Sequence, residues 1–252
     1  MCKIKLNILI LVLILVSSNF LILNADQKSD FSAAIRKGDI NEVKKYIAEG
    51  SQLDTTDENN QYPLEIAIEE NHTDIVKLLI DKGANVNIVT DGQSLLHKAV
   101  GKANIKIVNV LLNKEIEIDF ADNNGETPLH SAAKSGLEEI CKLLIENRAN
   151  VNAKNKMDET PLHFAVRSGN LSLTKMFLGY GADMISRDKY GWIPLHEAAS
   201  NNRIDIMKYL IQQGAYMNVK TNDGETPLDL ASSRQMKNII ESAGGKSKED
   251  LN

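Results

Sequence analysis

The stretch GETPLHSAAKSG, residues 125–136, recurs further along the chain with few changes. Near-copies are DETPLHFAVRSG at 158–169 and GWIPLHEAASNN at 191–202. One leucine of the motif has six equivalents: Leu64, Leu96, Leu129, Leu162, Leu195 and Leu228. They are 32, 33, 33, 33 and 33 residues apart, and the one short interval falls in the connecting segment NIVTD at 87–91. A fixed period of this length predicts a row of similar units that support one another.

Within each unit the local pattern predicts two helices. A threonine before a proline, as in Thr127 and Pro128 or Thr160 and Pro161, is typical of a helix N-terminus. There the hydroxyl caps free N–H groups, and proline loses nothing because its N–H would be unpaired. A second helix follows with apolar residues at helical spacing, as in EEICKLLIE at 138–146. Neither helix can bury its apolar face alone, so we expect neighbouring units to stack.

The 33-residue period, the TPLH motif and segments such as GANVN at 83–87 together resemble the ankyrin repeat. The resemblance implies an all-α solenoid of stacked helix-turn-helix units, with β-hairpin-like loops and a concave groove. Residues 30–59 and 224–245 then form the N-terminal and C-terminal capping repeats, and residues 246–252 form a charged tail. The complete repeats between the caps span 60–91, 92–124, 125–157, 158–190 and 191–223.

The N-terminal 25 residues differ in composition from the repeats. Two lysines precede an unbroken apolar run at 8–16, and a polar break follows. This order is typical of a secretory signal peptide, and cleavage after Ala25 or after Ser18 fits it. The alternative is an uncleaved N-terminal anchor, because apolar residues at 20–23 extend the run toward the ~20 residues that a membrane span needs. Both interpretations predict export, either to a periplasmic or secreted location or to the surface of the inner membrane.

The charge balance argues against nucleic acid as a partner. The formal charge is −5, and removal of the leader leaves 27 basic against 34 acidic residues, a charge of −7. Nucleic-acid binding depends on the neutralisation of phosphates, which an acidic chain does poorly. Cys141 would be the one thiol of the mature chain, which excludes an intramolecular disulfide. Its apolar helical position predicts a buried, inert thiol.

One position of the motif is histidine in four consecutive units: His97, His130, His163 and His196. Packed helices lie about 8–10 Å apart, whereas zinc needs ligand nitrogens ~2.1 Å from one ion. Adjacent histidines therefore cannot share a metal, and we expect no metal site. The ankyrin resemblance implies instead that each imidazole hydrogen-bonds loop backbone and locks neighbouring units. Glu65 and Asp229 replace the histidine in the outer units, where fewer neighbours need to be tied.

No pattern predicts a catalytic site or a bound cofactor. The chain lacks the GxSxG, HExxH, P-loop and dinucleotide-binding motifs. Glu126 and Glu159 recur at one hairpin position, but one repeat separates them, at or beyond the ~5–9.5 Å between paired glycosidase carboxyl groups. We also expect both carboxyl groups to lie on solvated loops, which would leave their pKa values unshifted. The chain is therefore predicted to be no enzyme.

Partner binding is expected at positions that the repeat framework does not dictate. By the ankyrin resemblance, these are the hairpin tips and the exposed face of the first helix of each unit. The first full unit offers acidic residues there: Asp57, Glu58, Glu69 and Glu70. Later units offer a basic and aromatic set, which we predict to bind the partner: Lys154, Lys156, Met157, Arg167, Arg187, Lys189, Tyr190 and Trp192. The alternatives are a solvated charged face and a tryptophan packed on neighbouring tips.

Two residues of this set lead to a mutational prediction. Trp192 stands where other units have a polar residue, and exposed Trp, Tyr and Arg are typical binding anchors. Alanine at both Trp192 and Arg167 is predicted to weaken partner capture and to leave thermal unfolding almost unchanged.

Two residues depart from the repeat pattern. Ile185 replaces an asparagine and should remove a polar hairpin contact. Glu115 stands in place of a glycine-type helix stop.

The leading hypothesis is a monomeric, non-catalytic scaffold that binds an unidentified protein partner outside the cytoplasm. Alternatives are a structural or accessory subunit that stabilises an envelope enzyme, and an effector that acts on host proteins. Contact with a membrane is expected only if the leader is uncleaved. The Ile-, Lys- and Asn-rich composition fits a bacterial source.

Overall fold

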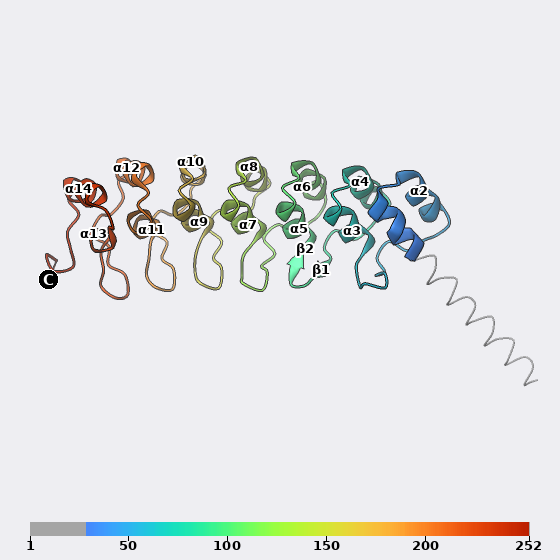
Figure 1. Cartoon of the computed structure of the whole chain (residues 1–252), viewed down its shortest axis with the longest axis horizontal. Helices are drawn as coiled ribbons and strands as arrows, with labels where there is room; N and C mark the ends of the chain where they lie inside the picture. Colours follow the sequence, from blue (N-terminus) through green and yellow to red (C-terminus); the bar gives the residue numbers. More distant parts are fainter. Residues whose placement is uncertain (1–28, 252) are drawn as a thin grey trace, which may run out of the picture. The chain divides into compact units, whose positions relative to one another are not determined.

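A computed structural model describes residues 29–251, so the predicted leader and its cleavage sites lie outside the described residues. The chain divides into two compact units, one ending at Ile88 and the other beginning at Val89. Figure 1 labels the helices and strands of both. This boundary falls in the loop that lacks one residue relative to the other repeats. Within 29–251, no helix is both long enough and apolar enough to span a bilayer.

The first unit contains two helix pairs. Residues 29–37 are helical and are followed by α2 (Ile40–Ala48), α3 (Pro63–Glu69) and α4 (Thr73–Asp81). Asp39 caps α2, because its Oδ1 accepts the N–H groups of Asn41 and Glu42. In the second pair, the imidazole Nε2 of His72 lies 3.2 Å from the carbonyl oxygen of Arg36, which links this pair to the first.

The second unit begins with a two-stranded hairpin, β1 (Val89–Thr90) and β2 (Gln93–Ser94). The strands are antiparallel, with Val89 opposite Ser94 and Thr90 opposite Gln93. The shortened loop explains this pairing. The missing residue leaves Asp91 and Gly92 as a two-residue turn, both at positive φ, and Asp-Gly is a favoured turn of this kind.

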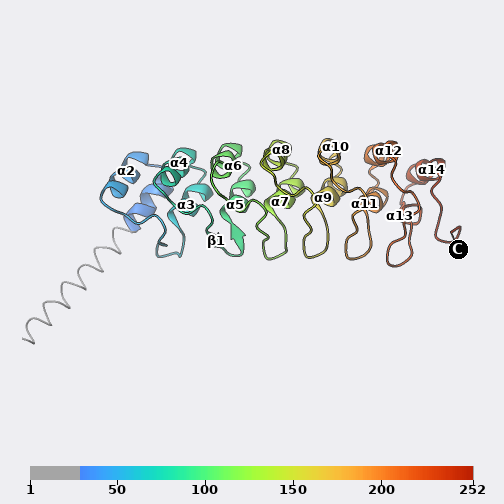
Figure 2. The same ribbon diagram turned by 180° about the vertical axis from the view of Figure 1, so that it is seen from behind.

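Five helix pairs follow in the second unit. Their first helices are α5 (Leu95–Gly101), α7 (Pro128–Lys134), α9 (Pro161–Ser168), α11 (Pro194–Ser200) and α13 (Pro227–Leu230). Their second helices are α6 (Ile105–Leu112), α8 (Glu138–Glu146), α10 (Leu171–Gly179), α12 (Ile204–Gln212) and α14 (Arg234–Ser242). Within this unit the first helices pack on one another as one layer and the second helices lie as another (Figure 2).

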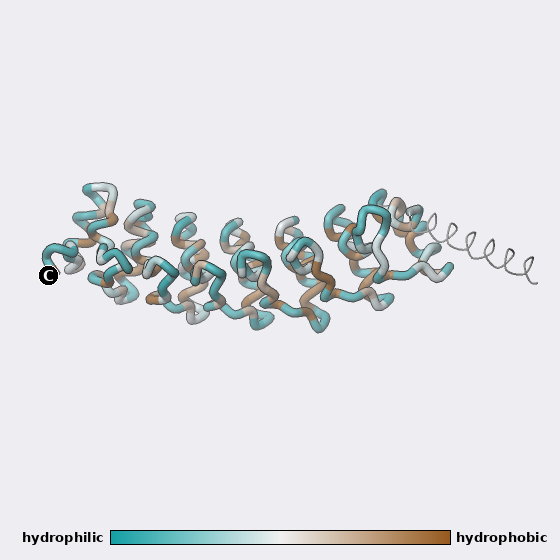
Figure 3. Tube along the Cα trace, turned by 90° about the horizontal axis from the view of Figure 1, so that it is seen from below, coloured by the Kyte–Doolittle hydropathy of each residue, from teal (hydrophilic) through white to brown (hydrophobic). Residues whose placement is uncertain are grey.

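The core of the second unit lies between successive pairs, as the repeat pattern predicts. The motif leucines from Leu96 to Leu195 are fully buried, and so are small residues such as Ala132 and Ala133. Apolar residues gather on the helices, whereas the turns that end the hairpins are mostly hydrophilic (Figure 3). Cys141 is fully buried on α8, and burial raises the pKa of its thiol to about 12, as expected for an inert cysteine.

Helix starts follow the predicted threonine and proline pattern. Thr127, Thr160 and Thr226 are the N-cap residues of α7, α9 and α13, with proline at the first turn of each. At α11 the N-cap is Ile193, which has no hydroxyl. The structure thus confirms the all-α repeat prediction, and the strands of the described range are confined to β1 and β2.

Candidate partner-binding surface

Each motif histidine of the second unit donates to a loop carbonyl, and the bonds of His97, His130 and His163 span two repeats. The Nε2 atoms of His97, His130 and His196 lie 3.0 Å from the carbonyl oxygens of Glu126, Glu159 and Val219, respectively. His163 makes the same contact with Trp192 at 3.3 Å. A carbonyl oxygen can only accept, so each Nε2 carries the proton and donates it. For His97, His130 and His163 the acceptor lies in the next repeat, which is the bridging role that the ankyrin resemblance implied. Val219 lies in the same repeat as His196.

The other ring nitrogen holds the start of its own helix. The backbone N–H groups of Thr127, Thr160 and Ile193 point to Nδ1 of the histidine three residues later, at 3.0–3.1 Å. Since Nδ1 must accept here, these three rings are neutral. Burial lowers the pKa of all four histidines and brings the pKa of His196 to about 4. Across residues 29–251, no group of three or more His, Cys, Asp or Glu side chains is placed to hold a metal.

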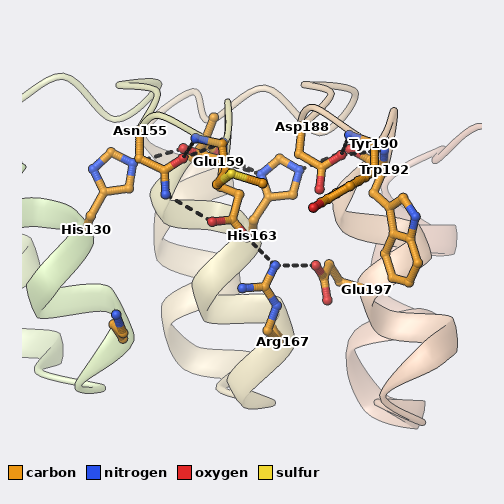
Figure 4. A network of polar contacts seen from close by, with 12 residues as sticks. His130, Asn155, Glu159, His163, Arg167, Asp188, Tyr190, Trp192 and Glu197 are labelled. Carbon is orange, nitrogen blue, oxygen red and sulfur yellow. Dashed lines mark hydrogen bonds and ion pairs between the residues drawn. The ribbon is translucent and has the colours of Figure 1, made fainter. Parts of the chain in front are cut away.

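The hairpin turns beside these histidines are fixed by a single side-chain oxygen. Asp188 Oδ1 accepts the N–H groups of Tyr190 and Trp192, each at 2.8 Å. Asn155 Oδ1 does the same one repeat earlier for Met157 and Glu159. Both turns are drawn in Figure 4. The conformation of each tip is therefore set before any partner arrives.

Backbone hydrogen bonds also join neighbouring tips. Lys156 N donates to Asn124 O, Lys189 N to Met157 O, and Asn222 N to Tyr190 O, each at 2.9 Å. These bonds place Met157 next to Lys189 and Tyr190. The side-chain amide of Asn222 adds a bond of 2.8 Å to Lys189 O. Consecutive tips thus form one continuous, ordered edge.

Four of the predicted binding residues share this edge, and we call them the tip patch: Lys156, Met157, Lys189 and Tyr190. Met157 is 38% exposed and Tyr190 is 59% exposed. Both lysines are exposed, and within residues 29–251 neither ammonium group has an acidic partner. The patch therefore presents two apolar side chains beside two unpaired positive charges.

Two other predicted residues use their charge within the hairpins. Lys154 Nζ donates to the carbonyl oxygen of Arg187 at 3.0 Å. A guanidinium nitrogen of Arg187 donates to Lys220 O at 2.9 Å and to Gly191 O at 3.1 Å. Each cation thus reaches the equivalent residue of the next repeat. Their side chains brace the hairpins.

Arg167 occupies a different place, on the face of α9. Its guanidinium pairs with Glu159 in its own repeat and with Glu197 on α11 (Figure 4). It also lies over the ring of Phe164, 5.5 Å from the ring centroid. Hydrogen bonding to Glu197, opposed by burial and aided by Glu159, raises the pKa of Arg167. The contacts argue against the expectation that alanine at both Trp192 and Arg167 leaves thermal unfolding almost unchanged, because loss of Arg167 would leave the almost fully buried Glu197 carboxylate without its cation.

Comparison with known proteins places the chain. A family model described as ankyrin repeats, three copies, matches residues 31–122, 115–188 and 162–242. The chain belongs to the ankyrin-repeat family.

Known ankyrin structures share the arrangement. The crystal structure of the ankyrin repeat domain of Bcl-3, a member of the IkappaB protein family, has a TM-score of 0.76 and 26% identity. It covers 84% of this chain and 97% of that one. The human ASB11 ankyrin repeat domain has a TM-score of 0.74 and 26% identity, and it covers 86% of this chain and 98% of that one.

Curated ankyrin proteins match over a shorter stretch. The "ankyrin repeat, SAM and basic leucine zipper domain-containing protein 1" of Pongo abelii is 28% identical over 101 residues, and the Gorilla gorilla gorilla protein has the same identity over the same length. The match takes in 38% of this chain but 21% of those proteins, so the chain spans about a fifth of the length of these relatives. Ankyrin repeats in general are protein-interaction scaffolds and typically non-catalytic.

Trp192 contributes both to the contacts between ankyrin repeats and to the exposed surface. Its backbone carbonyl receives the His163 bond, and its ring lies 6.1 Å from the ring of His196. The side chain is half-buried beside α11. It therefore flanks the tip patch but has only part of its surface open to a partner.

Three acidic residues differ from their sequence-based roles. Glu159 is not simply solvated: burial would raise its pKa, but hydrogen bonds from Asn155 and Arg167 outweigh this and lower it. In the first unit, Asp57 is buried and pairs with Arg36, so it offers no acidic binding surface. Asp229 ties more than its own helix start, because its carboxylate accepts the N–H groups of both Thr226 and Lys248.

The outer repeats are expected to need fewer bonds to neighbouring segments. At Asp229 this expectation is wrong, because the carboxylate also bonds Lys248 in the charged tail. Asn218 adds to the same attachment, because its Oδ1 accepts the N–H of Lys246 at 2.7 Å. The carbonyl oxygen of Lys246 in turn accepts the hydroxyl of Thr226 at 2.8 Å. A short polar tail carries no hydrophobic periodicity, so its sequence gave no signal for these contacts.

Proposed function

We propose that this ankyrin protein is a non-catalytic adaptor that captures an acidic segment of a protein partner on the tip patch. The observation that carries the proposal is the side-by-side exposure of Met157 and Tyr190 next to two lysines without acidic partners. Tyrosine and other large side chains concentrate binding energy at interfaces, and unpaired positive charges accelerate encounter with an acidic surface.

The ordered tips support this assignment over the rest of the surface. Ordering of flexible side chains and loops on binding weakens affinity. Here Asp188 and Asn155 fix the turns, and backbone bonds join them, so little loop ordering remains when the partner binds. Lys154 and Arg187 contribute by holding the hairpins, and Trp192 by extending the apolar area.

We also propose that the adaptor works outside the cytoplasm. The two early lysines and the apolar run at 8–16 support export, with cleavage after Ala25 favoured over an uncleaved anchor. Sequencing of the mature N-terminus in each cell fraction tests this. An N-terminus at Met1 in the cytoplasmic fraction would contradict export.

The binding site is tested by site-specific photo-crosslinking in the native cells. A photoreactive amino acid replaces Tyr190 in one strain and the exposed Lys142 on α8 in a control strain. We expect one discrete protein adduct from position 190 and none from position 142. Equal adducts from both positions would place the partner elsewhere or show non-specific contact.

A matched variant tests the chemistry of the patch. Lys189→Asn with Tyr190→Asp gives this tip the residues Asn222 and Asp223 that the next tip already uses. The backbone bonds of the edge do not depend on these side chains, so we expect an unchanged midpoint of thermal unfolding and loss of the adduct formed from a photoreactive residue at Met157. Retention of that adduct would contradict the proposal.

A further inference from the structure

A groove of about 350 Å³ lies between the end of α10 and the loop that follows α12. Leu178, Met184, Ile185 and Tyr216 line it, together with the carboxyl-bearing Asp183. No lysine or arginine lines the groove, and none of its residues belongs to the tip patch. It is therefore a separate surface of the second unit.

Between other neighbouring repeats, the equivalent position carries an asparagine side chain that bonds the backbone of the next repeat, and we call this contact the polar brace. Asn152 Oδ1 accepts the N–H of Asp183 at 2.8 Å, and its amide nitrogen donates to Gly181 O at 3.1 Å. Asn218 repeats both bonds one repeat later than the groove, with Lys246 N and Gly244 O. The side chain at this position thus normally ties one hairpin to the next.

At the groove, the side chain that makes the brace is replaced, and so is the residue whose backbone N–H it would accept. Ile185 stands at the position of Asn152, and its side chain cannot accept a hydrogen bond. Tyr216 stands at the position of Asp183. Ile185 is 48% exposed and Tyr216 is 65% exposed. At this position the polar brace is thus replaced by two exposed, largely apolar side chains, Ile185 and Tyr216. Apolar side chains that gather on a surface are typical of an interaction site.

The charge of the groove indicates what it accepts. Asp183 uses Oδ1 to accept the N–H of Ile185 at 2.9 Å, and its carboxylate remains exposed on the groove lining. An aliphatic side chain fits against Leu178, Met184 and Ile185, while a cation beside it would face Asp183. We propose that this groove docks a peptide segment of a protein partner that presents an aliphatic residue next to a lysine or arginine.

Nuclear magnetic resonance on methyl-labelled protein tests this with two blocked pentapeptides, acetyl-Gly-Leu-Lys-Gly-Gly-amide and its Leu-Glu counterpart. We expect the Leu-Lys peptide to shift the Ile185 and Met184 methyl signals saturably. The Leu-Glu peptide should bind at least about tenfold more weakly, because it sets like charges against each other at Asp183. Equal binding of both peptides, or no saturable shift, would overturn the proposal.

The control variant restores the polar brace. Ile185→Asn with Tyr216→Asp recreates the pair formed by Asn152 and Asp183, so we expect an equal or higher midpoint of thermal unfolding and loss of peptide binding at the Met184 methyl. Undiminished binding would overturn the assignment. Methyl shifts that depend on protein concentration alone would overturn it in favour of self-association. Because the tip patch is untouched, loss of peptide binding here with normal crosslinking from Tyr190 separates this proposal from the proposed function.

Discussion

Arg167 shows how much of this stack rests on single side chains. Its guanidinium joins two carboxylates from adjacent repeats, and one of them, Glu197, has a side chain only 5% exposed. One repeat earlier, Lys134 stands at the same position and pairs with Glu126 alone, with 60% of its side chain exposed. Exposed pairs contribute little, whereas removal of one partner of a buried pair leaves an uncompensated charge. The two positions should therefore differ in energetic weight.

Arg167→Ala is expected to lower the free energy of unfolding by ~1–3 kcal/mol, below the range for fully buried pairs because its side chain is 37% exposed. Lys134→Ala is the matched control and should cost about 0–1 kcal/mol. Urea denaturation of both variants measures the difference. Equal losses would show that Glu197 is not held by Arg167 as the structure indicates.

The contacts of Arg167 also mark a limit of sequence reasoning. The repeat pattern identified its position as exposed on the first helix, because lysine and serine occur there in neighbouring repeats. Its second partner, Glu197, lies 30 residues away and appears at that position in no other repeat. A contact that occurs once leaves no periodic signal.

At the scale of the hairpin, two equivalent glycines separate backbone strain from crowding. Gly191 and Gly224 both have positive φ, 76° and 78°. A Cβ on Gly191 would lie 2.8 Å from Asn222 N, whereas one on Gly224 would meet nothing within 4 Å. Alanine at Gly224 therefore costs only the strain of a positive φ, whereas alanine at Gly191 also brings its Cβ too close to the neighbouring tip.

Gly224→Ala is expected to cost about 1 kcal/mol, the penalty of a left-handed conformation for an L-residue. Gly191→Ala should cost more, because the neighbouring tip must also shift, and it should expose the N–H of Asn222 to hydrogen exchange. Thermal unfolding and amide exchange of the two variants test this. A Gly191→Ala loss no larger than that of Gly224→Ala would mean that the tips are not tightly joined.

Elements with a strong local signal were predictable from the sequence. The threonine and proline of the motif predict the helix start, and Thr127 and Thr160 are the N-cap residues of α7 and α9. The histidine is expected to bridge to the next repeat, and His130 and His163 donate to the carbonyl oxygens of Glu159 and Trp192 there. Ile193 breaks the pattern, yet α11 starts at the same point, because His196 Nδ1 accepts the backbone N–H of Ile193 and needs no hydroxyl. The hydrogen bond to the histidine thus holds this helix start without the threonine hydroxyl.

For the whole stack, the histidine bridges predict acid sensitivity. Burial lowers the pKa of all four motif histidines below the ordinary value of 6.5. As the pH falls below 6.5, the unfolded chain therefore binds more protons than the folded chain. The stability they contribute is complete above pH 6.5 and is lost as pH falls toward the folded pKa, about 4 for His196. At ~1.4 kcal/mol per pKa unit, His196 alone accounts for roughly 3 kcal/mol across that window.

Urea denaturation between pH 7 and pH 5 should therefore show a falling free energy of unfolding. The carboxyl groups with lowered pKa titrate below this window and do not cause the fall; they are Asp57, Glu159, Asp229 and Asp250. His130→Gln serves as the control: it destabilises the chain but should flatten the pH dependence. An unchanged slope in this variant would contradict the assignment.

Periodicity predicted the fold and the order of repeats, because the motif recurs in successive copies, and it indicated the role of the histidine, which recurs in four of them. It could not separate the tip patch from Lys154 and Arg187, which differ only in where their side chains reach. Nor could it identify the attachment of the tail through Asp229, which happens once. Recurrence in sequence therefore reports the framework, and individual contacts have to be seen.

The bonds between neighbouring tips run from one main chain to the next. Any amino acid except proline supplies the same N–H and carbonyl groups, so Lys189 and Tyr190, which contribute only these groups to the edge, can change without loosening it. Mutation can therefore explore new partners at these positions while the fold is left unharmed. Binding specificity can therefore change in evolution faster than the fold does.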